Sequence, residues 1–196
     1  MNVTFGEKYL KDAENRQPGA QPQRFLMWLS VVASSMLFAG LTSAYIVKKG
    51  SGDWKLFQIP TVFIINTIII LLSSTTLYWA YLAAKKDNLL QTKLALFTTS
   101  LLGITFLTGQ WIGYQHLIAS GIVLSGGNAS EGFFYIITGL HGLHIVGALI
   151  ALTVMIIKTI LLKVNSQNLL GLEMVSIFWH SLGILWLYLY LFLQFN

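Results

Sequence analysis

The stretch GFFYIITGLHGLHIVGALIALTVMII, residues 132–157, decides the fold of this chain. It contains two histidines but no lysine, arginine, aspartate or glutamate. At ~1.5 Å of rise per residue, a helix of this length crosses the ~30 Å hydrocarbon core of a bilayer. Because a bilayer offers no water to the backbone, every N–H and C=O must be paired within the segment. The stretch therefore predicts a transmembrane helix.

Four further stretches have the same apolar character and are separated by polar segments. Only 10% of the residues are charged and 55% are hydrophobic, whereas an average soluble domain is roughly a quarter charged. A large soluble helical bundle is disfavoured, since charged faces at helical spacing are missing. We predict an all-α bundle of five transmembrane helices over residues 25–196, after a polar N-terminal arm, residues 1–24. The predicted spans are 25–47, 61–84, 94–117, 132–157 and 172–195.

Composition excludes several kinds of chemistry. The chain has no cysteine, so disulfides, thiolate metal sites and a cysteine nucleophile are excluded. Its net charge is +5, but the basic residues flank the spans and form no single run, which argues against nucleic acid as a partner. Residues 1–24 contain no apolar segment of the kind found in a cleavable signal peptide.

The basic residues predict the orientation. Three lie on one side of the predicted spans: Lys48, Lys49 and Lys55. Nine lie on the side of the N-terminal arm: Lys8, Lys11, Arg16, Arg24, Lys85, Lys86, Lys93, Lys158 and Lys163. Since cytoplasmic loops carry the excess of Lys and Arg, we predict a cytoplasmic N-terminus, and five spans then place the C-terminus in the periplasm.

Ionisable side chains inside the spans are few, and such residues are usually functional. His141 and His144 are three residues apart and share one face of a helix. Glu173 precedes His180 by seven residues, so these two also share a face. His144 and His180 lie at a similar depth, so their imidazoles meet if the fourth and fifth helices are neighbours.

Three interpretations of these residues stay open. Imidazole is a common metal ligand, so a haem or metal site is one, although a third ligand at the same level is missing. A buried, hydrogen-bonded cluster that fixes helix packing is the second, and a lipid-headgroup or proton-relay role is the third. We assign no catalytic, cofactor or metal-binding residue to this chain. The candidate site is an intramembrane cluster for packing or lipid binding: His141, His144, Glu173, Trp179 and His180.

Small residues predict close contacts between helices. Ser35, Ala39 and Ser43 are spaced four apart on the first span. Gly109 and Gly113 form a GxxxG pattern on the third.

Two further groups of side chains have simple expected roles. The amides of Asn66 and Gln110 are expected to hydrogen-bond across helices. Trp54, Trp111 and Trp179 lie off-centre in the chain's apolar segments or near their ends, which fits the aromatic belts of membrane proteins.

Residues 133–145, FFYIITGLHGLHI, resemble the signature of subunit III of haem–copper terminal oxidases. The final span is similar to that family's closing helix, in which a glutamate precedes a Trp-His pair at the same separation. The resemblance covers roughly residues 24–196. The supporting segments are Glu173, Phe178-Trp179-His180, Leu185-Trp186-Leu187, Ala39-Gly40 with Ala44-Tyr45, and Gln110-Trp111.

The resemblance implies the short, five-helix bacterial form of this subunit, since longer relatives carry two extra N-terminal helices. It implies a non-catalytic chain in the bacterial cytoplasmic membrane, beside subunits I and II, which bind the haem and copper. Phospholipid is the implied ligand, and support of proton uptake and of turnover lifetime is the implied role. Contact with other respiratory complexes is also open.

Other classes remain as alternatives to that family. The histidines on two helices also suit a haem-bearing membrane anchor of a respiratory dehydrogenase. A small transporter or channel is disfavoured, because no charged residues line a path and no internal repeat is present.

The sequence also departs from the family pattern. Ser34, Gly113 and Gly183 stand where the family usually has membrane carboxylates. Glu131 and Glu173 remain, both near span ends where we expect water to reach them. The chain is therefore expected to be a scaffold and not a proton path.

Overall fold

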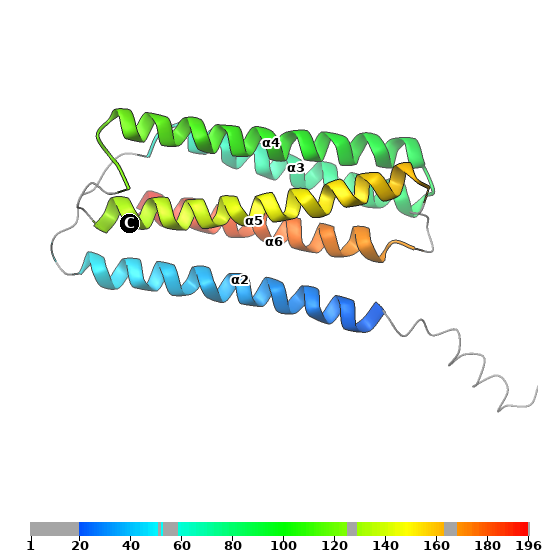
Figure 1. The fold of residues 1–196 in the computed structure, drawn as a ribbon, viewed down its shortest axis with the longest axis horizontal. Coiled ribbons are helices and arrows are strands. Elements are labelled where there is room, and N and C mark those ends of the chain that lie inside the picture. The colour runs from blue at the N-terminus through cyan, green and yellow to red at the C-terminus, as the bar shows by residue number, and fades with distance from the viewer. Residues whose placement is uncertain (1–19, 51, 53–58, 125–128, 163–167, 196) are drawn as a thin grey trace, which may run out of the picture.

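The computed structural model describes residues 20–50, 52, 59–124, 129–162 and 168–195. These residues form five helices and no strand, so the predicted all-α fold is confirmed (Figure 1). All five helices are long and apolar enough to cross a membrane, which makes this a multi-pass membrane protein. The helices are α2 (Ala20–Lys49), α3 (Val62–Lys85), α4 (Leu89–Ala119), α5 (Ala129–Ile160) and α6 (Leu170–Phe195).

Most helices extend beyond the expected spans. Helix α2 begins at Ala20, five residues before the expected span. Pro22 lies in its first turn, where backbone N–H groups have no partner within the helix, so the N–H that proline lacks is not needed there. Helix α4 begins at Leu89 and also continues past its apolar segment. Hydropathy locates the part of a helix that is compatible with hydrocarbon, but polar residues at either end can continue the same helix.

Four of the helices close into a ring. Helices α3 and α4 pack along their whole length, α4 packs on α5, α5 on α6, and α6 returns to α3. Among the described residues, α2 contacts α5 and α6 but neither α3 nor α4, and Figure 1 shows it along the outside of the bundle. The ring therefore supplies most of the core, to which α2 adds Phe38 and Tyr45 from the outside.

The turn between α3 and α4 explains their close pairing. Asp87 adopts a left-handed backbone conformation, with φ at 54°, which reverses the chain within a few residues. Asn88 then caps α4, because its side-chain oxygen accepts a hydrogen bond from the Gln91 N–H at 3.2 Å. A turn this short forces the two helices to lie side by side.

The bundle is apolar on both its inside and its outside. Large hydrophobic side chains cover its outer surface, as a hydrocarbon environment requires. Within the chain, 11% of the most apolar segment of α2 is buried, compared with 28–33% for the other four helices. Most of α2 therefore faces lipid or another protein.

Two tryptophans of α6 tie it to α3. The indole N–H of Trp179 donates to Ser73 Oγ at 3.0 Å, and that of Trp186 donates to Thr67 Oγ1 at 3.0 Å. Trp179 is completely buried. The aromatic-belt interpretation of Trp179 was therefore wrong, whereas Trp111 is 65% exposed on the outer surface, and Trp54 lies outside the described residues.

The small residues fall into two groups. A Cβ atom at Gly109 would collide with the side-chain amide of Asn66, and one at Gly113 would lie 2.7 Å from the Phe63 ring, so both glycines face α3. Ser35, Ala39 and Ser43 on α2 are instead exposed. None of the five described helices packs closely over that stripe.

Candidate functional site

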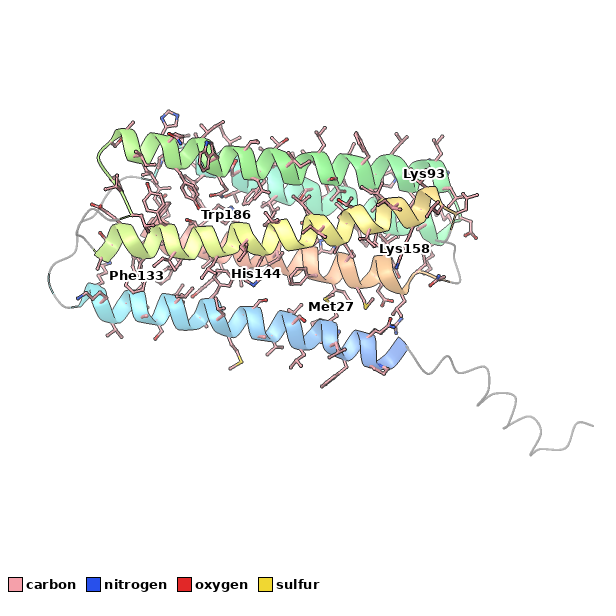
Figure 2. The ribbon with its side chains drawn as sticks, in the orientation of Figure 1. Met27, Lys93, Phe133, His144, Lys158 and Trp186 are labelled. Carbon is pink, nitrogen blue, oxygen red and sulfur yellow. The ribbon has the colours of Figure 1, made fainter. Side chains whose placement is uncertain are left out.

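The five residues of the predicted cluster lie in separate surroundings. Trp179 belongs to the interface between α6 and α3, as described above. His141 enters the ring core, and Figure 2 shows His144 on the same helix, between α5 and α2. His180 borders a groove between α2 and α6, and Glu173 lies at the start of α6. The structure therefore does not assemble these five residues into one site.

The environment of His141 is almost entirely aromatic. Its ring is fully buried and lies 5.0 Å from Trp186, 5.9 Å from Phe106 and 6.2 Å from Phe38, measured between ring centroids. These neighbours come from three other helices, so His141 is a packing centre of the bundle. Both of its nitrogens lack a hydrogen-bond partner within the described residues.

His144 and His180 are less enclosed than His141. His144 Nδ1 donates to the Leu140 carbonyl of its own helix at 2.8 Å, and its ring lies 5.5 Å from Phe38. In the described part of the chain, no ring contact joins His180 to either histidine of α5. The structure therefore does not show the pair of facing imidazoles that a bis-histidine haem requires.

The described residues also contain no group of three or more His, Asp or Glu side chains placed to share a metal ion. A helix-borne haem or metal site thus has no geometric support in this part of the chain.

Glu173 is engaged by the first helix. Arg24 Nη2 donates to Glu173 Oε2 at 2.7 Å, which joins the first turns of α2 to the start of α6. Both side chains are partly exposed, so the pair contributes at most about 1 kcal/mol. Its role is to fix where α2 begins against the bundle.

A second polar contact joins the same two helices further along. The hydroxyls of Thr42 and Tyr188 are 3.0 Å apart and share a hydrogen bond. Arg24 and Thr42 are eighteen residues apart on α2, which is about 27 Å at ~1.5 Å per residue. Helix α2 is therefore held to α6 by polar contacts at two widely separated points.

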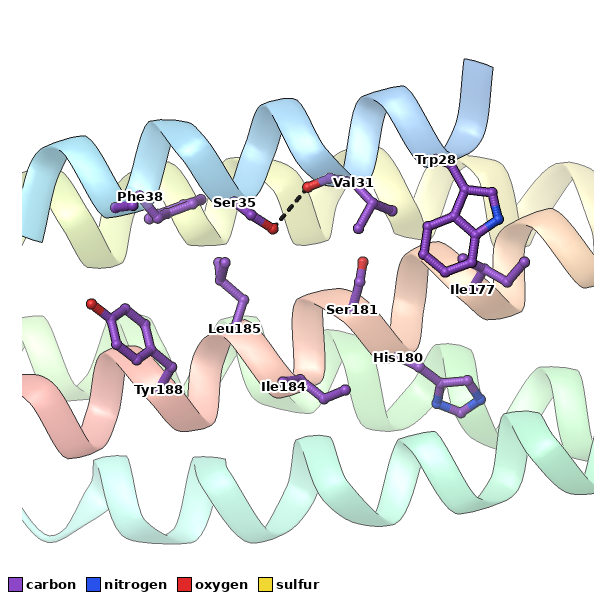
Figure 3. A pocket seen from close by; sticks show the side chains of 11 residues that line it. Trp28, Val31, Ser35, Phe38, Ile177, His180, Ser181, Ile184, Leu185 and Tyr188 are labelled. Atoms are coloured by element: carbon purple, nitrogen blue, oxygen red, sulfur yellow. Dashed lines mark hydrogen bonds between the residues drawn. The ribbon is translucent and has the colours of Figure 1, made fainter. Parts of the chain in front are cut away.

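An apolar groove of about 640 Å³ lies between these two contacts. Trp28, Ser35 and Phe38 line it from α2, and Ser181, Leu185 and Tyr188 from α6. Figure 3 shows Ser181 and Leu185 pointing toward α2, while His180 projects away from it. The Ser35 hydroxyl donates to the Val31 carbonyl of its own helix at 2.8 Å, so it presents little free polarity to the groove (Figure 3). The groove is suited to a hydrocarbon chain.

The expectation that water reaches both remaining carboxyl groups was wrong for Glu131. Its side chain is only 6% exposed, and its Oε2 atom has no hydrogen-bond partner within the described residues. Glu131 lies in the first turn of α5, where a helix N-terminus favours negative charge. Closeness to a span end did not reveal that the residue is buried in the folded chain.

The model of the family described as cytochrome c oxidase subunit III matches residues 20–196, which includes all five helices. This chain belongs to the cytochrome c oxidase subunit III family. Members of this family are non-catalytic subunits that associate with other oxidase subunits.

Individual relatives agree with the subunit III assignment. A probable cytochrome c oxidase subunit 3 of Nocardia farcinica is 33% identical over 172 residues, covering 84% of this chain and 82% of the relative. A cytochrome c oxidase subunit 3 of Thermostichus vulcanus is 32% identical over 169 residues, with 82% and 80% covered. A cytochrome bo(3) ubiquinol oxidase subunit 3 of Pseudomonas aeruginosa is 32% identical over 168 residues, with 83% and 79% covered.

The departures from the subunit III pattern have structural counterparts. The Phe63 ring occupies the space next to Gly113. A Cβ atom at Gly183 would lie 3.1 Å from Ser74 Oγ. Both positions are buried and lie against α3. A larger side chain at either position would require the neighbouring side chain of α3, Phe63 or Ser74, to move.

Sequence reasoning missed the residues that attach α2 and α6 to their neighbours. Arg24 was counted only as a charge of the N-terminal arm, and Thr42 and Tyr188 were not singled out. Thr67 and Ser73 were also overlooked, although each hydroxyl accepts a tryptophan N–H. The sequence does contain a hydroxyl residue on α3 for each of these two tryptophans of α6. These pairs can be predicted only once the two helices are known to be adjacent.

Proposed function

We propose that this chain is subunit III of an aerobic respiratory haem–copper oxidase in a bacterial cytoplasmic membrane. It stabilises catalytic subunit I and its proton uptake through helix packing and bound phospholipid, and it lies beside subunits I and II. Family membership supports this proposal. Relatives are named for both cytochrome c and ubiquinol oxidases. We infer that the partner subunits, and not this chain, set the electron donor.

The observation that carries the lipid part of the proposal is the groove between α2 and α6. Its lining is apolar over most of its length, and Trp28 stands at its Arg24 end. Trp side chains favour the headgroup region of a bilayer, and a nearby arginine attracts a phosphate. One acyl chain would then lie in the apolar groove, with its phosphate near Arg24, whose guanidinium also donates to Glu173.

The charges also support the proposed orientation. Arg24, Lys85, Lys86, Lys93 and Lys158 lie at the end of the bundle where α2 begins, and Figure 2 labels Lys93 and Lys158 there. Lys48 and Lys49 lie at the opposite end. This distribution favours a cytoplasmic location for the Arg24 end.

Deleting this chain from its host is expected to leave an oxidase that still assembles its haem and copper centres but inactivates sooner during turnover. The reason is that stabilisation of subunit I is lost while the redox centres remain. Oxygen consumption by the purified enzyme, followed until activity ceases, measures this effect. Unchanged assembly together with an unchanged inactivation rate would contradict the proposal.

Filling the groove tests the lipid part separately. Ala39→Phe places a ring in the groove, so we expect the purified oxidase to retain less phospholipid and to inactivate sooner. Ala33→Phe on the same helix is the matched control, since Ala33 is exposed and does not line the groove. Native mass spectrometry measures the retained lipid. Equal lipid retention in both variants would exclude the groove as the lipid site, whatever the deletion shows.

A further inference from the structure

The two halves of α2 are attached to the bundle in different ways. The buried side chains of this helix, Phe38, Thr42 and Tyr45, all lie in its second half and share one face. None of residues 22–37 is buried. The second half therefore packs into the core, whereas the first half lies on the surface of the bundle.

Aromatic contacts hold the second half in place. The Phe38 ring lies 5.5 Å from the His144 ring of α5, measured between ring centroids. The Tyr45 ring lies 5.1 Å from the Phe192 ring of α6 in the same measure. Since these contacts reach two different helices, they fix both the position and the rotation of this half of α2.

The first half has a single polar attachment. Within the described residues, the ion pair of Arg24 with Glu173 is the only hydrogen bond or ion pair that joins residues 22–37 to another helix. The apolar groove begins at Trp28 and lies between this half of α2 and α6 (Figure 3). Breaking one ion pair would therefore release the first half without removing any side chain of α2 from the core.

The helix is weakened where its two halves meet. A Cβ atom at Gly40 would meet no heavy atom within 4 Å, so packing does not account for this glycine. Glycine weakens the interior of a helix. The Thr42 hydroxyl is shared between the Phe38 and Ala39 carbonyls, at 3.0 and 3.1 Å, and hydroxyl contacts of this kind often bend helices. Bending of α2 is therefore easiest near Gly40.

We propose that the first half of α2, from Arg24 to Leu37, is a lid over the groove that bends away from α6 near Gly40. The Arg24–Glu173 ion pair is its latch. Opening widens the groove at the Arg24 end, so that a phospholipid acyl chain enters or leaves, and closing retains the chain. The incoming phosphate competes with the Glu173 carboxylate for Arg24, which couples headgroup binding to opening. This inference rests on the proposed lipid site and adds how lipid is exchanged there.

Lipid exchange in the purified oxidase tests the latch. Native mass spectrometry follows the replacement of bound phospholipid by deuterium-labelled phosphatidylglycerol supplied in detergent micelles, and the relevant signal is the lipid that Ala39→Phe removes. Glu173→Gln should accelerate the replacement by up to about fivefold, the factor that an exposed ion pair contributes. Lys85→Gln, at an exposed lysine of α3, is the matched control and should leave the rate unchanged.

The same measurement distinguishes a lid from a fixed site. In a fixed site, Glu173→Gln would leave the rate unchanged or lower it, because the carboxylate that competes with the phosphate for Arg24 is gone. Either result would overturn the lid, even though the lipid site itself would stand. If Ala39→Phe removed no lipid, the proposed lipid site and the lid would both be refuted.

Gly40→Ala tests the hinge. We expect lipid exchange to slow by up to about fivefold, because alanine strengthens the helix without meeting any neighbouring atom. Gly147→Ala on α5 is the matched control, since a Cβ atom there also meets no heavy atom within 4 Å. Equal exchange rates in these two variants would overturn the hinge near Gly40.

Spin labels measure the motion of the lid directly, since the chain has no cysteine of its own. Phe25→Cys with Ile160→Cys reports on the Arg24 end of the bundle, and Ile46→Cys with Ile136→Cys on the opposite end; all four side chains are exposed. Double electron–electron resonance should show that Glu173→Gln lengthens and broadens the first distance and leaves the second unchanged. An unchanged first distance, or an equal change at both ends, would overturn the proposal.

Discussion

Replacing Trp179 with alanine is expected to reduce the stability of the bundle by about 3–5 kcal/mol. The side chain is fully buried where α6 meets α3. Its ring also reaches α4, since a Cβ at Gly103 would lie 2.7 Å from its outer edge. Truncation removes contacts to both helices and leaves a cavity. It also leaves the Ser73 hydroxyl without the N–H that it accepts.

Thermal unfolding of the chain in detergent or nanodiscs measures this loss. Trp179→Phe separates the two contributions, because it retains most of the ring but removes the hydrogen bond, and it should cost about 1 kcal/mol from that bond plus a smaller cavity term. Trp111→Ala is the matched control, since Trp111 is largely exposed on α4. Equal losses from Trp179→Ala and Trp111→Ala would show that Trp179 does not hold α6 to the ring.

Introducing a carboxylate at the position where the resemblance implies one, through Gly113→Glu, is expected to prevent normal folding. Even a methyl group at this position would lie 2.7 Å from Phe63 Cε2. The Phe63 ring has little freedom to move, since it is 1% exposed and packs against Phe134 and Trp186, with ring centroids at 5.5 and 6.4 Å. Overpacking of this kind typically costs about 1–3 kcal/mol per substitution, and an unpaired buried charge adds further to it.

The yield of folded chain in membranes and its melting temperature measure this effect. Gly113→Ala isolates the steric part and should be destabilising, whereas Gly139→Ala and Gly147→Ala have no heavy atom within 4 Å of the added carbon. Those two variants should be neutral or stabilising, because alanine favours a helix over glycine by about 1 kcal/mol. Normal folding of Gly113→Glu would refute this account of the α3–α4 contact.

The surroundings of Gly113 and Gly183 bear on the proposed scaffold role. The Phe63 ring at Gly113 and the Ser74 hydroxyl near Gly183 fill the places next to two of the substituted carboxylate positions. A carboxylate at Gly113 would require simultaneous repacking of α3. The core of this bundle therefore leaves no space for a carboxylate at Gly113, which is consistent with the proposed scaffold role.

Helix number and the type of fold could be predicted because they depend on composition along the chain. Residues 132–157 predict a transmembrane helix on their own, and α5 contains all of them. The helix ends were less predictable, since α2 and α4 begin several residues before their apolar segments. Polar residues such as Gln91 continue a helix outside the hydrocarbon, where hydropathy no longer distinguishes helix from loop.

The grouping of the polar residues could not be predicted in the same way. His141 and His144 are three residues apart, yet one is enclosed by Phe106 and Trp186 while the other bonds to its own helix. Glu173 shares a helix face with His180 but pairs with Arg24, far away in the sequence. Periodicity gives the direction of a side chain around its own helix axis, but it does not say which helix lies there.

The sequence by itself determined that this chain has five membrane-spanning helices and that it resembles subunit III of the oxidases. Each helix satisfies its own backbone hydrogen bonds in a bilayer, so its existence needs no neighbour. Only the tertiary structure decided that α2 lies outside a four-helix ring, that Trp179 is a core residue, and that Phe106 packs against His141. Those features depend on which helices are adjacent, because side-chain packing and hydrogen bonds between helices choose the neighbours.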